Sequence, residues 1–221
     1  MTELKAVILD IDGTLLDSND AHAQAFVEAG NQMGIDVDFA QVRRLIGMGG
    51  DKLIPRVFGF EQDSEQGEEL DERKGEIFRQ QFLPNLKPMA GARALLEHLR
   101  AQGLALVVAT SASEDDLKGL LEKAGVEDLI DEATSAGDVE ETKPAPDPVE
   151  SALDQLGCRP DQVVMLGDTP YDVEAASAAG VEIIAVRCGG WSTEELTGAA
   201  AVYDDPADIL KSYSELPLTR S

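Results

Sequence analysis

The chain has 221 residues, of which 43% are hydrophobic, and it carries 43 acidic residues against 18 Lys and Arg, for a net charge of −25. This length allows a large buried core, and the composition is that of a globular protein rather than a disordered or fibrous one. The strong negative charge repels nucleic acids and anionic membranes, so we expect neither as a partner.

The sequence lacks the features of a membrane protein or a disulfide-bonded one. No apolar run approaches the roughly 20 residues that a membrane-spanning helix needs. The first residues, MTELKAV, lack the basic start and long apolar stretch of a signal peptide. The two cysteines, Cys158 and Cys188, have a spacing that predicts neither a disulfide framework nor a zinc site. We therefore expect a cytoplasmic protein, and we take a monomer as the default oligomeric state.

The chain begins with a predicted buried strand, followed by a long helical segment. Residues 6–9, AVIL, are apolar and typical of a central strand. Residues 18–86 contain no convincing strand, and their apolar residues recur at helical spacing in three places, around 26–33, 42–46 and 70–82. We therefore expect a small helical domain over residues 18–86, called the insert below, and a core domain formed by residues 1–17 and 87–221.

From residue 88 onward, strands and helices alternate. The predicted strands are residues 104–110, 163–167 and 182–186, with an edge strand near residue 201 and helices between them. A last helix is expected near residues 209–210, and residues 214–221 are expected to form a frayed tail. Short strands that alternate with helices are typical of a parallel sheet covered on both faces. The sequence thus predicts an α/β protein.

Polar residues follow the predicted strands where each one ends. They are Asp10 and Asp12 after the first strand, Thr110 and Ser111 after the second, Lys143 before a Pro-rich turn, and Asp168 and Asp172 after the strand at 163–167. The carboxyl ends of parallel strands lie at one edge of a sheet, so we expect these side chains to meet. Crowded carboxylates repel one another unless a cation lies among them, and Mg²⁺ binds carboxylates together with a phosphate. Lysine and hydroxyl donors would bind the remaining phosphate oxygens.

The spacing of Asp10 and Asp12 suits a reaction at phosphorus. Residues i and i+2 of an extended segment point the same way. One carboxylate can attack phosphorus and form an acyl phosphate, while the other protonates the leaving alcohol and later activates water. Gly13 has no side chain, which lets the backbone approach the phosphate closely.

These residues resemble a known family. DIDGT at 10–14, the strand-terminal Thr110, Lys143 and GDTPYD at 167–172 are similar to the four sequence motifs of the haloacid dehalogenase superfamily, in order, strand context and spacing. The insert resembles the helical cap of phosphoglycolate phosphatases and β-phosphoglucomutases. The resemblance covers essentially the whole chain, and it implies a Rossmann-like parallel sheet core with an inserted small α-helical cap domain.

The resemblance also implies roles for the acids. Asp10 would be the nucleophile and Asp12 the general acid and base. Mg²⁺ would bind the carboxylates of Asp10 and Asp168, and the backbone carbonyl of Asp12. The insert would close over the site and exclude water.

The remaining motif residues would bind the phosphoryl group. The resemblance implies that the Thr110 hydroxyl and the Ser111 amide contact it, near the Gly13 backbone. Because Thr110 and Ser111 are adjacent hydroxyl residues, either could be the hydroxyl donor, and the strand pattern favours Thr110. Lys143 would neutralise the charge of the nucleophile and the phosphate, and Asp172 would support either the metal site or Lys143.

The predicted function is that of a Mg²⁺-dependent phosphatase acting on a small phosphorylated metabolite through an aspartyl-phosphate. The alternative is a sugar phosphomutase of the β-phosphoglucomutase type, which shares every catalytic residue. Against it, the corresponding loop of the mutases carries a basic residue where this chain has Gly50. A haloacid dehalogenase lacks the second aspartate, whereas Asp12 is present, and phospho-accepting receiver domains are about half this length.

The residues of the insert do not specify which leaving group the enzyme recognises. His22 lies near the start of the insert, where it either contacts substrate or occupies a surface position of a helix. Lys52 and Arg56 follow a glycine cluster at residues 47–50, and they either meet an anionic group or are ordinary helix charges. The sequence therefore predicts a phosphorylated metabolite without specifying which one.

Overall fold

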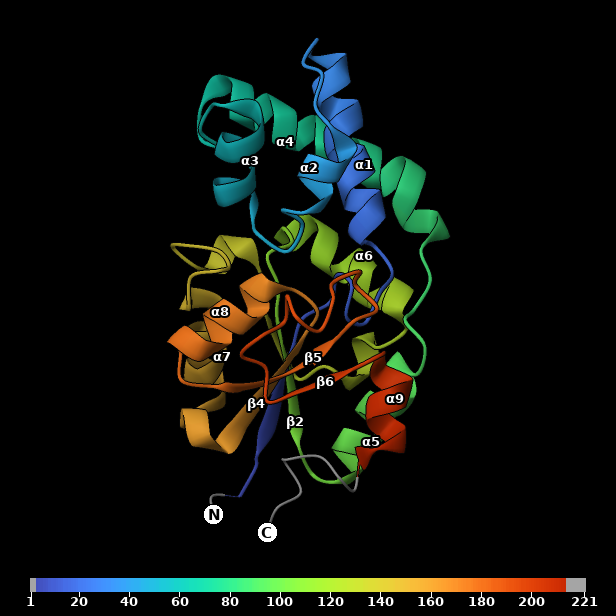
Figure 1. Ribbon diagram of the computed structural model, residues 1–221, viewed down its shortest axis with the longest axis vertical. Coiled ribbons are helices and arrows are strands. Elements are labelled where there is room, and N and C mark those ends of the chain that lie inside the picture. The colour runs from blue at the N-terminus through green and yellow to red at the C-terminus, as the bar shows by residue number, and fades with distance from the viewer. Residues whose placement is uncertain (1–2, 214–221) are drawn as a thin grey trace.

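The computed structural model describes residues 3–213, and the predicted tail at 214–221 lies outside them. Within the described residues, six strands form one sheet in the order β3-β2-β1-β4-β5-β6, and every neighbouring pair is parallel. The strands are β1 (Ala6–Leu9), β2 (Ala105–Ala109), β3 (Glu132–Thr134), β4 (Val163–Gly167), β5 (Glu182–Val186) and β6 (Ala201–Tyr203). The predicted α/β fold with a parallel sheet is confirmed (Figure 1).

The central strand β1 lies between β2 and β4, where the strand order reverses. In open α/β sheets, ligands bind outside the carboxyl ends of the strands at such a reversal. Leu9, the last residue of β1, is paired with Val108 on one side and with Leu166 on the other. The three strands therefore end at nearly the same level, which brings the residues that follow them together.

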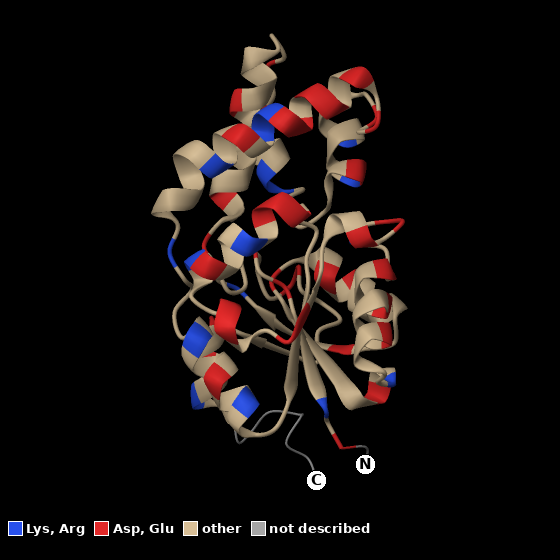
Figure 2. Ribbon diagram, turned by 180° about the vertical axis from the view of Figure 1, so that it is seen from behind, with Lys and Arg blue, Asp and Glu red and all other residues tan. Residues whose placement is uncertain are grey.

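Helices cover both faces of the sheet because alternate strand residues point to opposite sides. Val7 and Leu9 belong to one apolar cluster with residues of α5, whereas Ala6 and Ile8 belong to a second cluster with residues of α7. The covering helices are α5 (Ala92–Ala101), α6 (Glu114–Ala124) and α9 (Pro206–Lys211) on the first side, and α7 (Asp147–Leu156) and α8 (Pro170–Ala178) on the second. Figure 2 shows charged residues on these helices and none within the central strands.

The insert consists of helices that lie beyond the carboxyl ends of the strands (Figure 1). They are α1 (Asn19–Gln32), α2 (Phe39–Arg43), α3 (Gly50–Phe58) and α4 (Glu65–Ile77), followed by a π-helical turn at Phe78–Phe82 and a 3₁₀ turn at Leu83–Asn85. The prediction of helices without a sheet strand between β1 and β2 is confirmed. The division of the chain into domains at these boundaries stays a prediction.

Polar contacts join the insert to loops at the strand ends. They are Lys52 Nζ to Glu141 Oε2 at 2.7 Å, Gly49 N to Thr142 Oγ1 at 3.0 Å, Arg43 Nη2 to the Gly189 carbonyl at 2.6 Å and the Tyr171 hydroxyl to the Arg44 carbonyl at 2.7 Å. Lys52 is thus engaged by an acid of the core, and Arg56 lies against Met48 Sδ. The insert is therefore seated on the core.

Across residues 3–213, no helix combines the length and apolar character that crossing a membrane requires.

Candidate active site

Lys143 lies at the centre of the candidate site and is fully buried, with 0% of its surface exposed. Its ammonium Nζ is 2.6 Å from Asp10 Oδ1 and 2.7 Å from Asp172 Oδ1. Burial alone would lower the pKa of Lys143, but the carboxylates of Asp10 and Asp172 raise it above its ordinary value. Lys143 is therefore a fixed positive charge that holds together acids following two different strands.

Asp172 is oriented by the start of helix α8. Thr169 is the residue before the helix, Pro170 opens it, and the Thr169 hydroxyl accepts a hydrogen bond from the Asp172 amide at 3.1 Å. In return, Asp172 Oδ2 accepts hydrogen bonds from the Thr169 amide at 2.9 Å and from the Thr169 hydroxyl at 2.7 Å. This reciprocal capping leaves Oδ1 of Asp172 directed at Lys143. The sequence GDTPYD therefore builds a support for the lysine.

Asp10 and Asp168 carry more negative charge than the protein around them neutralises. Burial raises the pKa of Asp10 to about 7, opposed by Lys143 and assisted by the charges of Asp172 and Asp12. The pKa of Asp168 is raised well above its ordinary value by burial and then by the Asp10 and Asp172 carboxylates. Three carboxylates thus lie close together in a buried space, where the Lys143 ammonium contacts only Asp10 and Asp172, and this arrangement favours a further cation.

The ligand atoms available here fit a divalent metal ion. Carboxylate oxygens of Asp10, Asp168 and Asp172 lie within 4.8 Å of one another. The Thr14 hydroxyl lies 3.1 Å from Asp10 Oδ2 and 3.0 Å from Asp168 Oδ1, and its single hydrogen can be donated to only one of them. One of these oxygens therefore lacks the Thr14 proton at any moment. Hard oxygen donors with excess negative charge are the ligands that Mg²⁺ prefers.

Asp12 lies in a different environment from Asp10. Its Oδ1 accepts a hydrogen bond from the Ser18 hydroxyl at 2.5 Å and lies 2.9 Å from Nε2 of His22. Burial would raise the pKa of Asp12, but the His22 ring and the Ser18 hydroxyl hold it below its ordinary value. The two acids of the DIDGT motif therefore have pKa values shifted in opposite directions, which is the pattern of paired carboxylates with separate roles.

The two adjacent hydroxyl residues after β2 both line the site. Thr110 is buried, and its Oγ1 accepts a hydrogen bond from the Ala112 amide at 3.1 Å. The Ser111 hydroxyl is buried as well, and no residue within 3–213 forms a hydrogen bond with it. Both hydroxyls remain able to donate to a ligand, so the choice between Thr110 and Ser111 stays open.

Gly13 has a structural reason to be glycine. Its φ of +84° lies in the left-handed region, and an added Cβ would come within 2.1 Å of Asn19 Nδ2 and 2.3 Å of Asp168 Oδ2. Its amide donates a hydrogen bond to the Leu16 carbonyl at 2.8 Å. The space beside Gly13 is thus filled by two side chains of the site. That the Gly13 backbone also approaches a bound phosphate stays a prediction.

The structure reveals contacts that the sequence interpretation missed. Ser18 precedes α1, and Asn19 and His22 lie in its first turn. Ser18 and His22 contact Asp12, whereas Asn19 contacts Asp168. His22 is only 6% exposed and stacks on Phe78 with ring centroids 3.9 Å apart, so a surface position for it is wrong. The available signal was the polar pattern SNDAH at residues 18–22, a few residues after the DIDGT motif.

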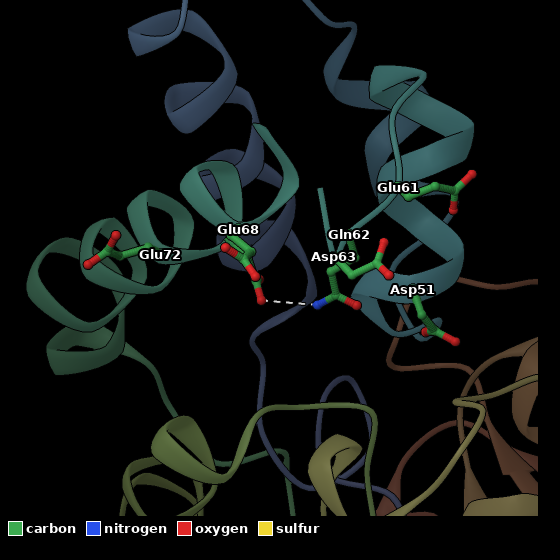
Figure 3. Close-up of a pocket in the computed structure, with 7 residues that line it drawn as sticks. Asp51, Glu61, Gln62, Asp63, Glu68 and Glu72 are labelled. Atoms are coloured by element: carbon green, nitrogen blue, oxygen red, sulfur yellow. Dashed lines mark hydrogen bonds between the residues drawn. The ribbon is translucent and has the colours of Figure 1, made fainter. Parts of the chain in front are cut away.

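A cavity of about 670 Å³ lies between the core and the insert. Its lining includes Asp10, Asp12, His22, Lys74, Arg79, Thr110 and Ser111. Lys74 and Arg79 both pair with the buried Asp116 of α6, at 3.7 and 2.9 Å. The cavity shares lining residues with a second pocket of about 640 Å³ in the insert, drawn in Figure 3, whose lining is acidic apart from Gln62.

Comparison with known proteins identifies related sequences and structures. A family model described as haloacid dehalogenase-like hydrolase matches residues 7–186. The chain is 35% identical over 217 residues to a phosphoglycolate phosphatase of Rhodospirillum rubrum, covering 93% of this chain and 89% of that protein. It is 28% identical over 215 residues to an N-acetylmuramic acid 6-phosphate phosphatase of Pseudomonas aeruginosa, covering 94% and 93%.

Solved structures show the same relationship. A hydrolase from Pseudomonas syringae superimposes with a TM-score of 0.88 at 29% identity, over 96% of this chain and 99% of that one. A putative β-phosphoglucomutase from Bacteroides vulgatus gives 0.84 at 26% identity, over 96% and 88%. The resemblance read from the four motifs is thereby confirmed, as is the prediction of a phosphatase-type hydrolase. This chain belongs to the haloacid dehalogenase-like hydrolases.

Proposed function

We propose that this hydrolase is a Mg²⁺-dependent phosphatase that cleaves a small phosphorylated metabolite through an aspartyl-phosphate on Asp10. The observation that carries the proposal is the pairing of Asp10 with the buried Lys143, at 2.6 Å, beside a second acid of opposite pKa shift, Asp12. A carboxylate fixed by one ammonium group, with an acid/base two residues away, supports nucleophilic attack at phosphorus.

Asp10 would attack the phosphorus atom with one carboxylate oxygen, and Lys143 would keep that carboxylate ionised and oriented. Bound Mg²⁺ would neutralise charge on the phosphoryl oxygens and align them for attack. The carboxylates of Asp10 and Asp168 and the backbone carbonyl of Asp12 would hold it. Asp172 would act through Lys143, as their 2.7 Å contact supports.

Asp12 would protonate the leaving alcohol and then activate the water that hydrolyses the acyl phosphate. As an ionised group with a lowered pKa, it suits the second role directly. For the first role it must carry a proton, which the negative charge of a phosphoryl group nearby favours. His22 and Ser18 hold the carboxylate in place for both steps.

Thr110, Ser111 and Lys143 would hold the phosphoryl oxygens that face away from the metal. The free hydroxyl of Ser111 and the position of Thr110 at the end of β2 support this role. The insert would enclose the leaving group, because its residues form the opposite wall of the cavity. We also propose that the enzyme is cytoplasmic and that it works as a monomer. The monomer is supported by the cavity, which the insert and the core of one chain line together.

Hydrolysis is favoured over phosphoryl transfer between sugar hydroxyls. Gly50, where the mutases carry a basic residue, opens helix α3, and a Cβ there would lie 2.5 Å from Gln62 Nε2. The nearby Lys52 is paired with Glu141 rather than directed at the catalytic acids. Neither position provides a free cation for the second phosphate of a sugar bisphosphate.

The proposal is tested by phosphate release from a panel of phosphomonoesters with Mg²⁺ and then with EDTA. The panel contains 2-phosphoglycolate, hexose 6-phosphates, β-glucose 1-phosphate and nucleoside monophosphates, with glucose 6-phosphate formation followed in parallel. Metal-dependent phosphate release supports the phosphatase. Isomerised sugar phosphate without free phosphate would instead identify a mutase, and release unaffected by EDTA would contradict the role of the metal.

A further inference from the structure

Asn19 is the first residue of α1 in the insert, yet its side chain is bound to the core. It is 2% exposed, and its Nδ2 donates hydrogen bonds to Asp168 Oδ2 at 3.0 Å and to the Gly189 carbonyl at 3.3 Å. The amide thus spans from the start of the insert to the acid that follows β4.

The backbone around Asp168 is shaped to admit this contact. A Cβ on Gly189 would lie 1.6 Å from Asp168 Oδ2, and one on Gly13 would lie 2.1 Å from Asn19 Nδ2. A side chain at either position would displace the carboxylate or the amide. Two glycines from distant parts of the chain therefore leave room for the pair of Asn19 and Asp168.

The two oxygens of Asp168 have different donors. Oδ1 lies against the Thr14 hydroxyl, which it shares with Asp10, whereas Oδ2 receives the amide of Asn19. An amide donor is neutral, so it fixes the direction of the carboxylate without cancelling the negative charge that attracts a cation. A lysine in this place would fix the direction of the carboxylate but would also cancel its negative charge.

We propose that Asn19 is a positioning residue, which orients the Asp168 carboxylate for binding a divalent cation. The inference rests on the proposed metal-dependent function, and it assigns to the insert a part in metal binding. Residues that hydrogen-bond a metal ligand typically change metal affinity by about 10- to 100-fold when they are removed. The neighbouring Ser18 and His22 act on Asp12 instead, so the effect of Asn19 is separable from theirs.

The test is Mg²⁺ binding to the full chain by titration calorimetry, in the absence of substrate, for the wild type and Asn19→Ala. We expect the Kd for Mg²⁺ to rise roughly tenfold or more in the variant. In steady-state kinetics, the Mg²⁺ concentration for half-maximal activity should rise in parallel, while kcat at saturating Mg²⁺ stays within about threefold. Asn31→Ala is the matched control, since Asn31 is an exposed residue of the same helix.

Each outcome decides a separate point. A folded Asn19→Ala protein that binds Mg²⁺ within twofold of the wild type overturns the role of Asn19. A loss of thermal stability with unchanged Mg²⁺ affinity shows a structural role only, and also overturns it. A folded wild type that binds no Mg²⁺ contradicts the proposed metal site itself. If Asn19→Ala does not fold, Asn19→Ser, which keeps a small polar side chain that is too short to reach Asp168, is measured with the same expectation.

Discussion

Lys143 and Asp10 form a buried ion pair of 2.6 Å between residues 133 positions apart in the sequence. One partner follows the central strand and the other precedes helix α7, so the pair exists only when the sheet is assembled. Removing one member of a buried pair leaves an uncompensated charge, which costs more than an exposed pair would. The site and the stability of the core are thereby coupled.

Replacing Lys143 should damage both stability and turnover. In Lys143→Ala, the carboxylates of Asp10 and Asp172 lose their shared cation, and we expect a destabilisation of about 3 kcal/mol or more. Activity at saturating Mg²⁺ should fall by roughly 10²-fold or more, because a fixed charge at the reacting group is lost. Urea unfolding and steady-state rates measure the two effects, and Lys118→Ala, at an exposed position of α6, is the control. Unchanged unfolding would show that the pair contributes no stability.

Asp10→Asn should abolish turnover in a protein that still folds, because Lys143 keeps its contact with Asp172. The amide is close in size to the carboxylate but is a poor nucleophile at phosphorus. Phosphate release from the best substrate of the panel measures the effect. Asp17→Asn, at an exposed position shortly after the motif, should retain wild-type activity. Retained activity in Asp10→Asn would remove Asp10 from its proposed role.

The roles of Asp12 and His22 in catalysis should be distinguishable by the pH dependence of the reaction. Asp12→Ala should slow turnover by roughly 10²-fold or more, as expected for lost general acid/base catalysis. His22→Phe keeps an aromatic ring against Phe78 but removes the contact with Asp12. Because that contact lowers the pKa of Asp12, the acidic limb of the pH profile of acyl-phosphate hydrolysis, the step in which Asp12 acts as the base, should move to higher pH in the variant. An unmoved acidic limb would mean that another group titrates there.

Stability without metal should fall as pH rises through the acidic range. The pKa of Asp10 is raised to about 7 in the folded protein, above the value of roughly 4 in an unfolded chain. A group that binds its proton more tightly when folded contributes its full stability below pH 4, and loses it as pH approaches 7. Asp168 is shifted in the same direction. Urea unfolding with EDTA, at several values between pH 5 and 8, measures this.

Added Mg²⁺ should reverse that loss, because it binds the ionised carboxylates. At a hundredfold excess over its Kd, a ligand of the folded state stabilises it by about 3 kcal/mol. The increment in the free energy of unfolding that Mg²⁺ provides should therefore be larger at pH 8 than at pH 5, where protons compete for the site. Asp168→Asn should lose most of the increment. An equal gain at both pH values would contradict a carboxylate metal site.

The choice between Thr110 and Ser111 is open to a direct comparison. The hydroxyl that binds the phosphoryl group should matter most in the transition state, so its removal should lower kcat/KM by roughly tenfold or more. Thr110→Val keeps the shape of the side chain, and Ser111→Ala removes only the buried hydroxyl that has no partner within residues 3–213. A loss confined to one variant identifies the donor. Equal and small losses in both would exclude a hydroxyl donor at this strand end.

The strands that build the site were predictable because they are apolar and buried. The predicted segments 6–9, 163–167 and 182–186 coincide with β1, β4 and β5, and 104–110 contains β2. By contrast, β3 was missed because it has three residues, Glu132–Thr134, and only the last is buried. The prediction that polar residues meet at the strand ends was possible because the carboxyl ends of parallel strands lie at one edge of a sheet.

The contacts of the insert could not be predicted in the same way. Asn19 and Asp168 are 149 positions apart, and nothing in local periodicity fixes which side of α1 faces the core. The hydrophobic pattern of α1 is weak, because its buried residues include Asn19 and His22 as well as alanines. Such polar contacts depend on how the insert is seated, which spacing alone does not encode.

The central claim is that Asp10 receives the phosphoryl group. The most direct measurement is acid-quench peptide mass spectrometry of Asp12→Ala after mixing with an aryl phosphate and Mg²⁺. A phenolate leaving group needs no proton from Asp12, so the acyl phosphate should form but hydrolyse slowly. We predict that the peptide containing Asp10 gains the mass of one phosphoryl group, and that the doubly substituted Asp10→Asn, Asp12→Ala protein gains none. A phosphoryl group on any other residue, or rapid phosphate release without modification of Asp10, would contradict the account.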